Sequence, residues 1–264
     1  MNRMFLDEPA ISSVVFYPRK ASIPKDLPSN VKTLRFQINK DILIGGYFFV
    51  KDKDLPSILL FHGNGEIALD YLYFMELFFE CDVNLAVVDF RGYGHSSGKP
   101  IYSSLITDAL PIYQEFKKWI NNNNFKDSIF VQGRSLGSVC ASEIGSHNSK
   151  ELKELKGIIF ESGFASVYNV MTRLFGVRGP EITSERLKEY SNDTRISKFQ
   201  KPTLIIHGTM DYIISCEEGK RIYDTIPKNI YKEIILIDGA GHNDIFSYEN
   251  QYFNPLKQFI LKYK

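Results

Sequence analysis

The sequence predicts an α/β fold in which helices cover both faces of a mostly parallel β-sheet. From residue 57 onward, short apolar segments alternate with longer segments whose apolar residues recur at helical spacing, and this alternation is typical of such a sheet. Two β-rich segments precede it, at 31–38 and 42–50, and the polar residues 39–41 between them predict a hairpin. The hairpin adds an antiparallel edge to the sheet.

The elements follow one another along the chain in a regular order. Apolar segments predict strands at 57–61, 84–90, 127–131, 157–160, 203–206 and 232–237. Helical spacing of apolar residues predicts helices at 66–79, 102–120 and 135–147. Pro111 lies inside the second of these helices and is expected to kink or split it. Asn254 and Pro255 are typical of the N-cap and first position of a final helix.

One long segment, at 162–198, interrupts the alternation. Because connections in a compact domain are usually much shorter, this segment is predicted to be a functional insertion, a small lid. Its residues Tyr168, Met171, Leu174 and Phe175 are spaced to form an apolar face. Residues 1–264 are therefore expected to form a single domain, with 162–198 as its lid.

The composition excludes several classes of protein. Hydrophobic residues make up 44% of the 264 residues and charged residues 24%, which excludes a disordered chain. Lys and Arg number 32 and Asp and Glu 31, so the net charge of +1 provides no overall field to attract nucleic acid or an acidic membrane.

The cysteines and the apolar runs indicate a cytoplasmic protein. Cys81, Cys140 and Cys216 are an odd number without metal-ligand spacing, as expected for free thiols in a reducing compartment. The first ten residues lack the apolar run of a signal peptide. No apolar run approaches the roughly 18 residues that a membrane span needs, so no transmembrane segment is expected.

The segment Gly-Arg-Ser-Leu-Gly at 133–137 is the strongest chemical signal. A strand is predicted before it and a helix with small residues after it, which is the context of a nucleophile elbow. In such a turn the hydroxyl of Ser135 projects into a cleft. The neighbouring strand and helix crowd positions 133 and 137, so only residues without a bulky side chain fit there. The N-terminal end of the following helix directs N–H groups toward the same place.

With this motif the chain resembles the α/β-hydrolases, and within them the branch of esterases, lipase-like hydrolases and acyl-protein thioesterases. The resemblance rests on His-Gly-Asn-Gly at 62–65, Asp-Phe-Arg-Gly-Tyr-Gly at 89–94 and the elbow at 133–137, in the expected order. It covers about residues 31–263, whereas the first 30 residues match poorly. The resemblance implies an α/β-hydrolase fold with a doubly wound sheet.

A serine hydroxyl is a weak nucleophile and needs a base. Of the five histidines, His147 is expected at the surface, and His62 and His207 each end an apolar strand, where a packed role is favoured. His95 lies in a loop and is also interpreted as structural. His242 follows the last predicted strand in a glycine-rich loop that could place its imidazole over the elbow, and it is the predicted base.

An acid must hold the base in one tautomer. Asp211 follows the strand at 203–206, and the order Ser135, Asp211, His242 is that of the α/β-hydrolases. Two other acids compete. Asp238 ends the last strand and is expected to shape the histidine loop, and Glu161 ends the strand before the insertion, where some members of the fold place their acid. Asp211 is preferred because its loop matches the family motif.

The oxyanion of an acyl-transfer reaction needs preorganised N–H donors. The residue after the nucleophile, Leu136, is expected to supply one backbone N–H. By resemblance, the backbone N–H of Asn64 supplies the second. The segment at 62–65 also suits a helix-entry turn before Glu66, and the two roles are compatible.

Three further charged residues near these motifs are interpreted as structural. Asp89 and Arg91 are expected to form a mutual ion pair or hydrogen bonds within their loop. Arg134 could contact an acidic group of a substrate, but packing and salt-bridge roles are more common, so it is left outside the predicted site.

The sequence therefore predicts a serine hydrolase that acts through an acyl-enzyme on a small-molecule ester. Because the cysteines and histidines lack ligand spacing, no metal and no organic cofactor is expected. Carboxylic esters are the preferred substrates, and the apolar residues of 162–198 suggest an acyl chain or an aromatic group. A thioesterase or a serine peptidase would use the same residues. A non-catalytic binding protein on the same fold is the alternative of another class.

Overall fold

The computed structural model describes residues 5–148, 150 and 152–264, and within them the predicted sheet is present. Its eight strands lie in the order β1-β2-β4-β3-β5-β6-β7-β8. The first two strands form the predicted antiparallel hairpin, and β2 is also antiparallel to β4. From β4 onward neighbouring strands are parallel. The predicted α/β-hydrolase fold class, a mostly parallel sheet with an antiparallel N-terminal edge, is thus confirmed.

The elements agree with most of the predicted boundaries to within a few residues. The strands are β1 (Val31–Asn39), β2 (Ile42–Phe49), β3 (Ser57–Phe61), β4 (Asn84–Val88), β5 (Ile129–Arg134), β6 (Leu155–Glu161), β7 (Thr203–Gly208) and β8 (Lys232–Ile237). The α-helices are α1 (Pro9–Val15), α2 (Met75–Phe79), α3 (Tyr102–Thr107), α4 (Ala109–Asn122), α5 (Ser138–Gly145), α6 (Val167–Asn169), α7 (Asn192–Ile196), α8 (Cys216–Thr225) and α9 (Glu249–Tyr263). Short 3₁₀ and π turns are η1 (Phe5–Asp7), η2 (Ala68–Tyr73), η3 (Ser135–Gly137), η4 (Val170–Leu174), η5 (Lys188–Tyr190) and η6 (Ile245–Ser247).

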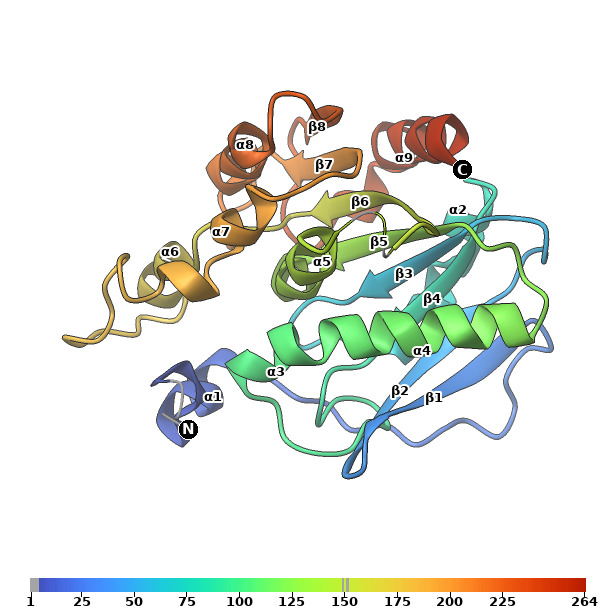
Figure 1. Ribbon diagram of the computed structural model, residues 1–264, viewed down its shortest axis with the longest axis horizontal. Coiled ribbons are helices and arrows are strands. Elements are labelled where there is room, and N and C mark those ends of the chain that lie inside the picture. Colours follow the sequence, from blue (N-terminus) through green and yellow to red (C-terminus); the bar gives the residue numbers. More distant parts are fainter. Residues whose placement is uncertain (1–4, 149, 151) are drawn as a thin grey trace.

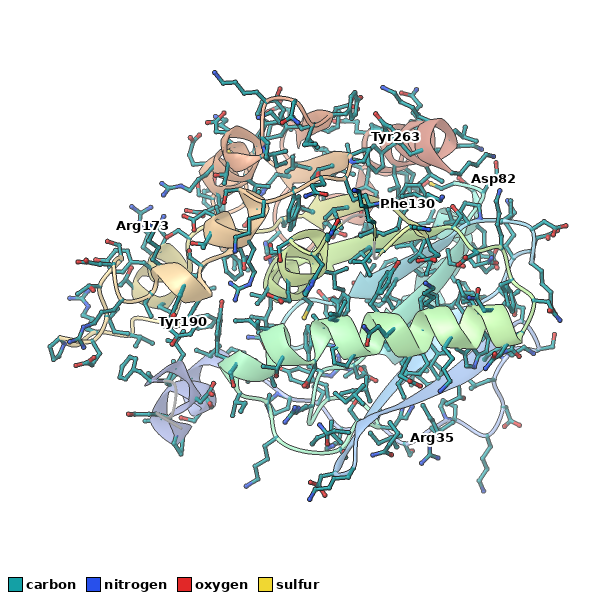
Figure 2. The ribbon with its side chains drawn as sticks, viewed as in Figure 1. Arg35, Asp82, Phe130, Arg173, Tyr190 and Tyr263 are labelled. Carbon is teal, nitrogen blue, oxygen red and sulfur yellow. The ribbon has the colours of Figure 1, made fainter. Side chains whose placement is uncertain are left out.

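Both faces of the sheet are covered, since the central strands β3, β4 and β5 are buried at every position. In β3, Leu59 and Phe61 pack into the core that includes α3, α4 and α5. Ile58 and Leu60, which point to the opposite face, pack into the core that includes α2 and α9. Alternate residues of a strand point to opposite faces, so a continuous apolar run needs a layer on each side. Side chains fill the space between sheet and helices, while Arg35 of β1 points outward (Figure 2).

The helix predicted at 102–120 is split, but not at Pro111. The break lies at Asp108, between α3 and α4, and Arg91 donates two hydrogen bonds to the Asp108 carboxylate at 2.6 and 2.5 Å. Pro111 lies in the first turn of α4. Because N–H groups of a first turn have no acceptor within the helix, a proline there costs no helical hydrogen bond. The expected Asp89–Arg91 ion pair is therefore wrong, because Arg91 reaches Asp108 instead. The alternative expectation for Asp89 is correct, since its backbone carbonyl accepts a hydrogen bond from Ser96 in the same loop.

The last helix begins earlier than its predicted N-cap. It starts at Glu249, so that Pro255 lies inside α9 rather than at its first position. Tyr252 and Phe253 in the added turns are buried in the core against α2. Burial of these two large side chains outweighs the local preference of proline for a helix start.

The carboxyl ends of β3, β5 and β6 point to one edge of the sheet, on the left in Figure 1. The segment at 162–198, with α6 and α7, lies at this edge, and so does α1 from the N-terminal part of the chain (Figure 1). Loops that follow parallel strands meet at such an edge, which is where open α/β sheets bind ligands. Among the described residues, no helix combines the length and the apolarity that crossing a membrane requires.

Candidate active site

Ser135 lies in a sharp turn between β5 and α5. Its φ of +49° is in the left-handed region, and its side chain is largely enclosed. A Cβ at Gly133 would lie 2.6 Å from the carbonyl oxygen of Gly137, and a Cβ at Gly137 would overlap the carbonyl oxygen of Phe61. The turn therefore has room for glycine alone at both positions, as the motif predicts.

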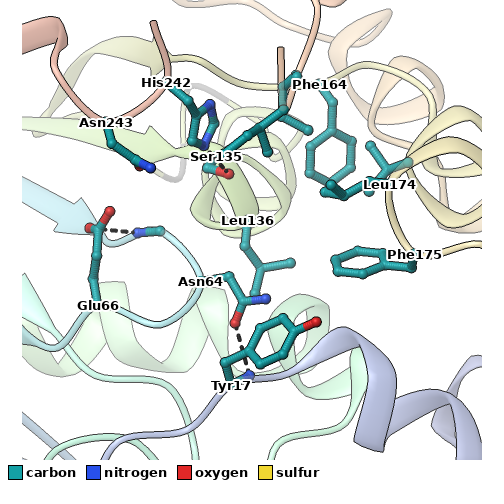
Figure 3. A pocket seen from close by; sticks show the side chains of 14 residues that line it. Tyr17, Asn64, Glu66, Ser135, Leu136, Phe164, Leu174, Phe175, His242 and Asn243 are labelled. Carbon is teal, nitrogen blue, oxygen red and sulfur yellow. Dashed lines mark hydrogen bonds between the residues drawn. The ribbon is translucent and has the colours of Figure 1, made fainter. Parts of the chain in front are cut away.

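His242 reaches this serine from the loop after β8. Its Nε2 lies 3.0 Å from Ser135 Oγ, and its Nδ1 lies 2.6 Å from Asp211 Oδ2 (Figure 3 shows the first of these contacts). These distances suit a hydroxyl that donates to the imidazole and an imidazole that donates to the carboxylate. The three residues that the sequence analysis places together are 76 and 31 positions apart in the chain, yet they are in direct contact.

The loop after β7 holds Asp211 in place. Its Oδ1 accepts hydrogen bonds from the backbone N–H groups of Ile213 and Ile214, at 2.9 and 2.7 Å. Its Oδ2 lies 3.3 Å from Nε2 of the buried His207. Burial opposes ionisation of Asp211, but the hydrogen bonds from His207, His242 and Ile214 outweigh it and hold the pKa of this carboxyl well below its usual range. Asp211 is thus an anion that faces the imidazole.

The competing acids face elsewhere. Glu161 is fully buried and accepts hydrogen bonds from Arg134, Gln132 and Tyr252. Asp238 accepts a hydrogen bond from Thr209 Oγ1. Neither of these carboxylates has a described contact with the imidazole of His242.

Three of the other histidines occupy the structural positions that the sequence predicts, and His147, expected at the surface, is half-buried. His62 and His207 are fully buried at the ends of β3 and β7. His95 packs its ring edge-on against Tyr47 and approaches the carbonyl oxygen of Leu34. His147 lies beside Glu143 near the end of α5.

The loop after β3 places Asn64, and the elbow after β5 places Leu136, at the same pocket as Ser135. Gly63 N–H donates to Glu66 Oε2 at 3.0 Å, which fixes the entry into this loop. No hydrogen bond described for residues 5–148, 150 and 152–264 uses the backbone N–H of Asn64 or of Leu136. These two N–H groups therefore have no described acceptor within the protein.

The side chain of Asn64 is engaged in contacts that the sequence analysis did not foresee. Its Nδ2 donates to the carbonyl oxygen of Val15 at 2.6 Å. Its Oδ1 accepts from Tyr17 N–H at 3.1 Å (Figure 3). The same oxygen accepts from Tyr93 O–H at 2.7 Å. The N-terminal segment, which carries no recognisable motif, is thereby fastened to the edge of the pocket.

The pocket over Ser135 is small and mostly apolar. It has a volume of about 260 Å³. The segment 162–198 supplies Phe164, Val170, Leu174 and Phe175 to its wall. Tyr17 lies at the opposite end of the pocket from His242 (Figure 3). Of the four residues expected to form an apolar face, Leu174 and Phe175 line the pocket, whereas Met171 is buried in the core and Tyr168 packs against that core. Tyr17 was missed because nothing in the sequence near it signals a site.

Comparison with known proteins places the chain in a family. The family model described as serine aminopeptidase S33, a group of α/β-hydrolases, matches residues 53–191. The chain belongs to this family. The match contains the loop after β3 and the elbow but not Asp211 or His242.

Curated relatives and solved structures are similar to this chain beyond the matched segment. Alpha/beta hydrolase domain-containing protein 17C of Mus musculus is 30% identical over 77% of the chain and 59% of its own length. Its Homo sapiens counterpart is also 30% identical, over 57% of its length. The chain thus spans less than two thirds of these relatives.

Two solved esterases share the fold. The esterase Pf2001 of Pyrococcus furiosus is 20% identical with a TM-score of 0.72, over 93% of this chain and 98% of its own. Est1E of Butyrivibrio proteoclasticus, solved with ferulic acid, is 17% identical with a TM-score of 0.68, over 87% and 98%. At this identity the likeness extends to the fold alone.

Proposed function

We propose that this protein is a serine hydrolase that cleaves carboxylic esters through an acyl-enzyme intermediate. The observation that carries the proposal is the continuous contact from Asp211 through His242 to Ser135, at 2.6 and 3.0 Å. Membership of a hydrolase family and the fold shared with two esterases support it.

The reaction follows from this arrangement. Ser135 Oγ attacks the ester carbonyl carbon as its proton passes to His242 Nε2, and the carbonyl oxygen becomes an oxyanion. The backbone N–H groups of Asn64 and Leu136 bind this oxyanion. Removal of one such donor in a known case costs about 2.7–4 kcal/mol.

The intermediate then collapses. The bond to the alcohol oxygen breaks, and His242 gives its proton to that leaving group. Water attacks the acyl-enzyme with His242 again as base, which releases the acid and restores Ser135. Asp211 stays ionised throughout and orients the imidazole.

The pocket favours an ester with a short acyl chain or an aromatic group. Its volume of about 260 Å³ is small, and its wall from Phe164 to Phe175 is apolar. Burial of apolar surface contributes roughly 25 cal/mol per Å² to binding. We propose that residues 162–198 act as a cap of a single domain and set this preference.

The family description suggests a peptidase as the second candidate. A peptidase that removes N-terminal residues needs a free acid for the substrate ammonium. Glu66 carries the one carboxylate among the described residues that line the pocket. Its oxygens are already occupied by Arg134, Gly63 N–H and Tyr71 O–H. The ester reading is therefore preferred over aminopeptidase activity. A thioesterase would use the same chemistry as an esterase.

The test combines a covalent probe with a substrate series. A fluorophosphonate probe is expected to label the wild-type protein at Ser135 and to leave Ser135→Ala unlabelled. p-Nitrophenyl esters of increasing chain length are expected to show the highest kcat/KM for short or aromatic acyl groups. Failure of the folded protein to be labelled would favour the non-catalytic binding protein. Labelling with turnover of thioesters or peptides, but of no ester, would contradict the ester assignment.

A further inference from the structure

Arg134, the second residue of the elbow motif, lies at the centre of a buried polar cluster. It is the last residue of β5, directly before Ser135, and its side chain is 7% exposed. A buried guanidinium is costly unless its charge and its five N–H donors find partners. The partners of Arg134 come from two separate loops and from the end of β6, and their positions indicate what the side chain does.

The first partner is the loop that carries Asn64. Arg134 Nε donates to Glu66 Oε1 at 2.6 Å, and the other oxygen of Glu66 accepts from Gly63 N–H at 3.0 Å. Tyr71 O–H donates to that same oxygen at 3.0 Å. Two hydrogen bonds in series therefore connect the guanidinium to the backbone directly before Asn64.

The second partner is Glu161, which holds the guanidinium from the end of β6. Arg134 Nη1 donates to Glu161 at the end of β6. The second oxygen of Glu161 accepts from Gln132 Nε2 at 2.8 Å and from Tyr252 O–H at 2.7 Å. The carboxylate that competed with Asp211 in the sequence analysis thus serves as the anchor of Arg134.

The third partner is the loop that carries the base. Arg134 Nη2 donates to the backbone carbonyl oxygen of His242 at 3.1 Å and lies 3.4 Å from Asn243 Oδ1. The ring of Phe246 stands 5.8 Å from the guanidinium carbon. The loop 238–244 contains two glycines, which leave its backbone many conformations. A hydrogen bond to the carbonyl oxygen of His242 therefore restricts the positions of its imidazole.

We propose that Arg134 is a positioning residue that holds the His242 loop and the Asn64 loop against the nucleophile elbow. It acts through these loops and touches no reacting atom. The inference rests on the proposed function. The three nitrogens of Arg134 each bind a different partner, whereas a lysine ammonium carries all its N–H donors on one nitrogen and cannot span the same three acceptors. The charge of Arg134 also holds the pKa of Glu66 below its usual range against the opposing effect of burial.

The test compares two conservative substitutions. Arg134→Lys keeps the charge but loses the fork, and we expect kcat to fall by about 10²-fold, as for a misplacement of about 1 Å, with KM little changed. Arg91→Lys is the matched control, since it breaks a similar pair, with Asp108, that lies outside the proposed site. It is expected to lower the melting temperature comparably and to leave kcat at the wild-type value.

A second readout does not depend on turnover. The proton between His242 Nδ1 and Asp211 is expected to give a low-field NMR signal that is absent from His242→Ala. Arg134→Lys should shift or broaden this signal, and Arg91→Lys should not. Equal kcat and an unmoved signal in Arg134→Lys would overturn the inference. If the wild type neither hydrolyses esters nor reacts with the probe, the proposed function fails, while the NMR signal still tests the positioning.

A milder substitution keeps the inference testable if Arg134→Lys does not fold. Glu161→Gln removes the charge of the anchor while it preserves the size of the side chain. It is expected to lower kcat in the same direction but by a smaller factor, and to move the same NMR signal. Wild-type kcat with an unmoved signal in this variant would count against the positioning role.

Discussion

Asp211 is arranged so that one of its oxygens is fixed by the backbone while the other faces the imidazole. The N–H groups of Ile213 and Ile214 hold Oδ1, and Oδ2 lies 2.6 Å from His242. A carboxylate held in this way keeps the imidazole in the tautomer whose Nε2 accepts the proton of Ser135. Ionisation of Asp211 at neutral pH is therefore required for the proposed chemistry.

The choice of acid can be tested directly. Asp211→Asn is expected to reduce kcat by up to about 10⁴-fold, because the amide favours the wrong tautomer of His242. Glu161→Gln should cause a far smaller loss, since it acts only through Arg134. Steady-state rates on the preferred p-nitrophenyl ester would measure both. Near wild-type activity of Asp211→Asn, together with an inactive Glu161→Gln, would show that the acid is misassigned.

The lowered pKa of Asp211 also has a consequence for stability. Since its pKa is lower in the folded chain, ionised Asp211 stabilises the fold above the usual aspartate pKa of about 3.9. This contribution is lost as the pH falls toward the lowered value. The difference in melting temperature between wild type and Asp211→Asn should be constant between about pH 5 and pH 8 and shrink below about pH 4. Thermal unfolding followed by circular dichroism at each pH would measure this difference. A difference in melting temperature that grows as the pH falls would contradict the expectation.

At the level of elements, the site depends on loops that follow parallel strands. The turns after β3, β5, β7 and β8 carry Asn64, Ser135, Asp211 and His242, and parallel strands bring them to one edge of the sheet. One of these turns is the elbow, where the backbone of Gly137 packs against the end of β3. Its geometry depends on the absence of a side chain.

Gly137→Ala tests this crowding without a change in backbone preference. The φ of Gly137 is −61°, which alanine adopts freely, but an added Cβ would overlap Phe61. We expect a loss of about 1–3 kcal/mol in unfolding free energy, measured by denaturant titration, together with loss of activity. In Gly176→Ala the φ of +63° is strained, but a Cβ there would meet no described atom within 4 Å. This control should therefore retain activity, and equal activity losses in both variants would contradict the explanation.

At the level of the whole molecule, a segment far from the motifs completes the pocket. The residues from α1 to Arg19 lie outside the family match at 53–191, yet they border the loop that carries Asn64. Arg19 donates to the carbonyl oxygen of Gly65 at 3.2 Å and pairs with Asp70. The first part of the chain thus contributes a wall and an anchor to a site whose chemistry lies more than 40 residues away.

Asn64→Ala separates the main-chain role of this residue from its side-chain role. The substitution removes the donor to the Val15 carbonyl oxygen and the acceptor of the Tyr93 hydroxyl, while Tyr17 N–H keeps the Tyr93 oxygen at 3.0 Å, so we expect a loss of about 1–3 kcal/mol in unfolding free energy. Activity should fall less than in Ser135→Ala, because the proposed oxyanion donor is a backbone N–H. Melting temperature and ester turnover would be measured together. A loss of turnover as large as that of Ser135→Ala in a folded variant would show that the side chain takes part directly.

The sequence by itself determined the strands in their chain order, several of the helices but not α1 or α8, the position of the elbow and the residues proposed for catalysis. These features follow from local patterns, namely apolar runs, glycine spacing and chain order. Only the tertiary structure decided that Asp211 rather than Glu161 faces His242, that Arg91 pairs with Asp108, and that α9 continues through Pro255. It also placed Tyr17 in the pocket and Arg134 between two loops and the end of β6. The reason is physical: contacts between side chains distant in the chain depend on how packed elements meet, and no local pattern of residues encodes which partner will be within reach.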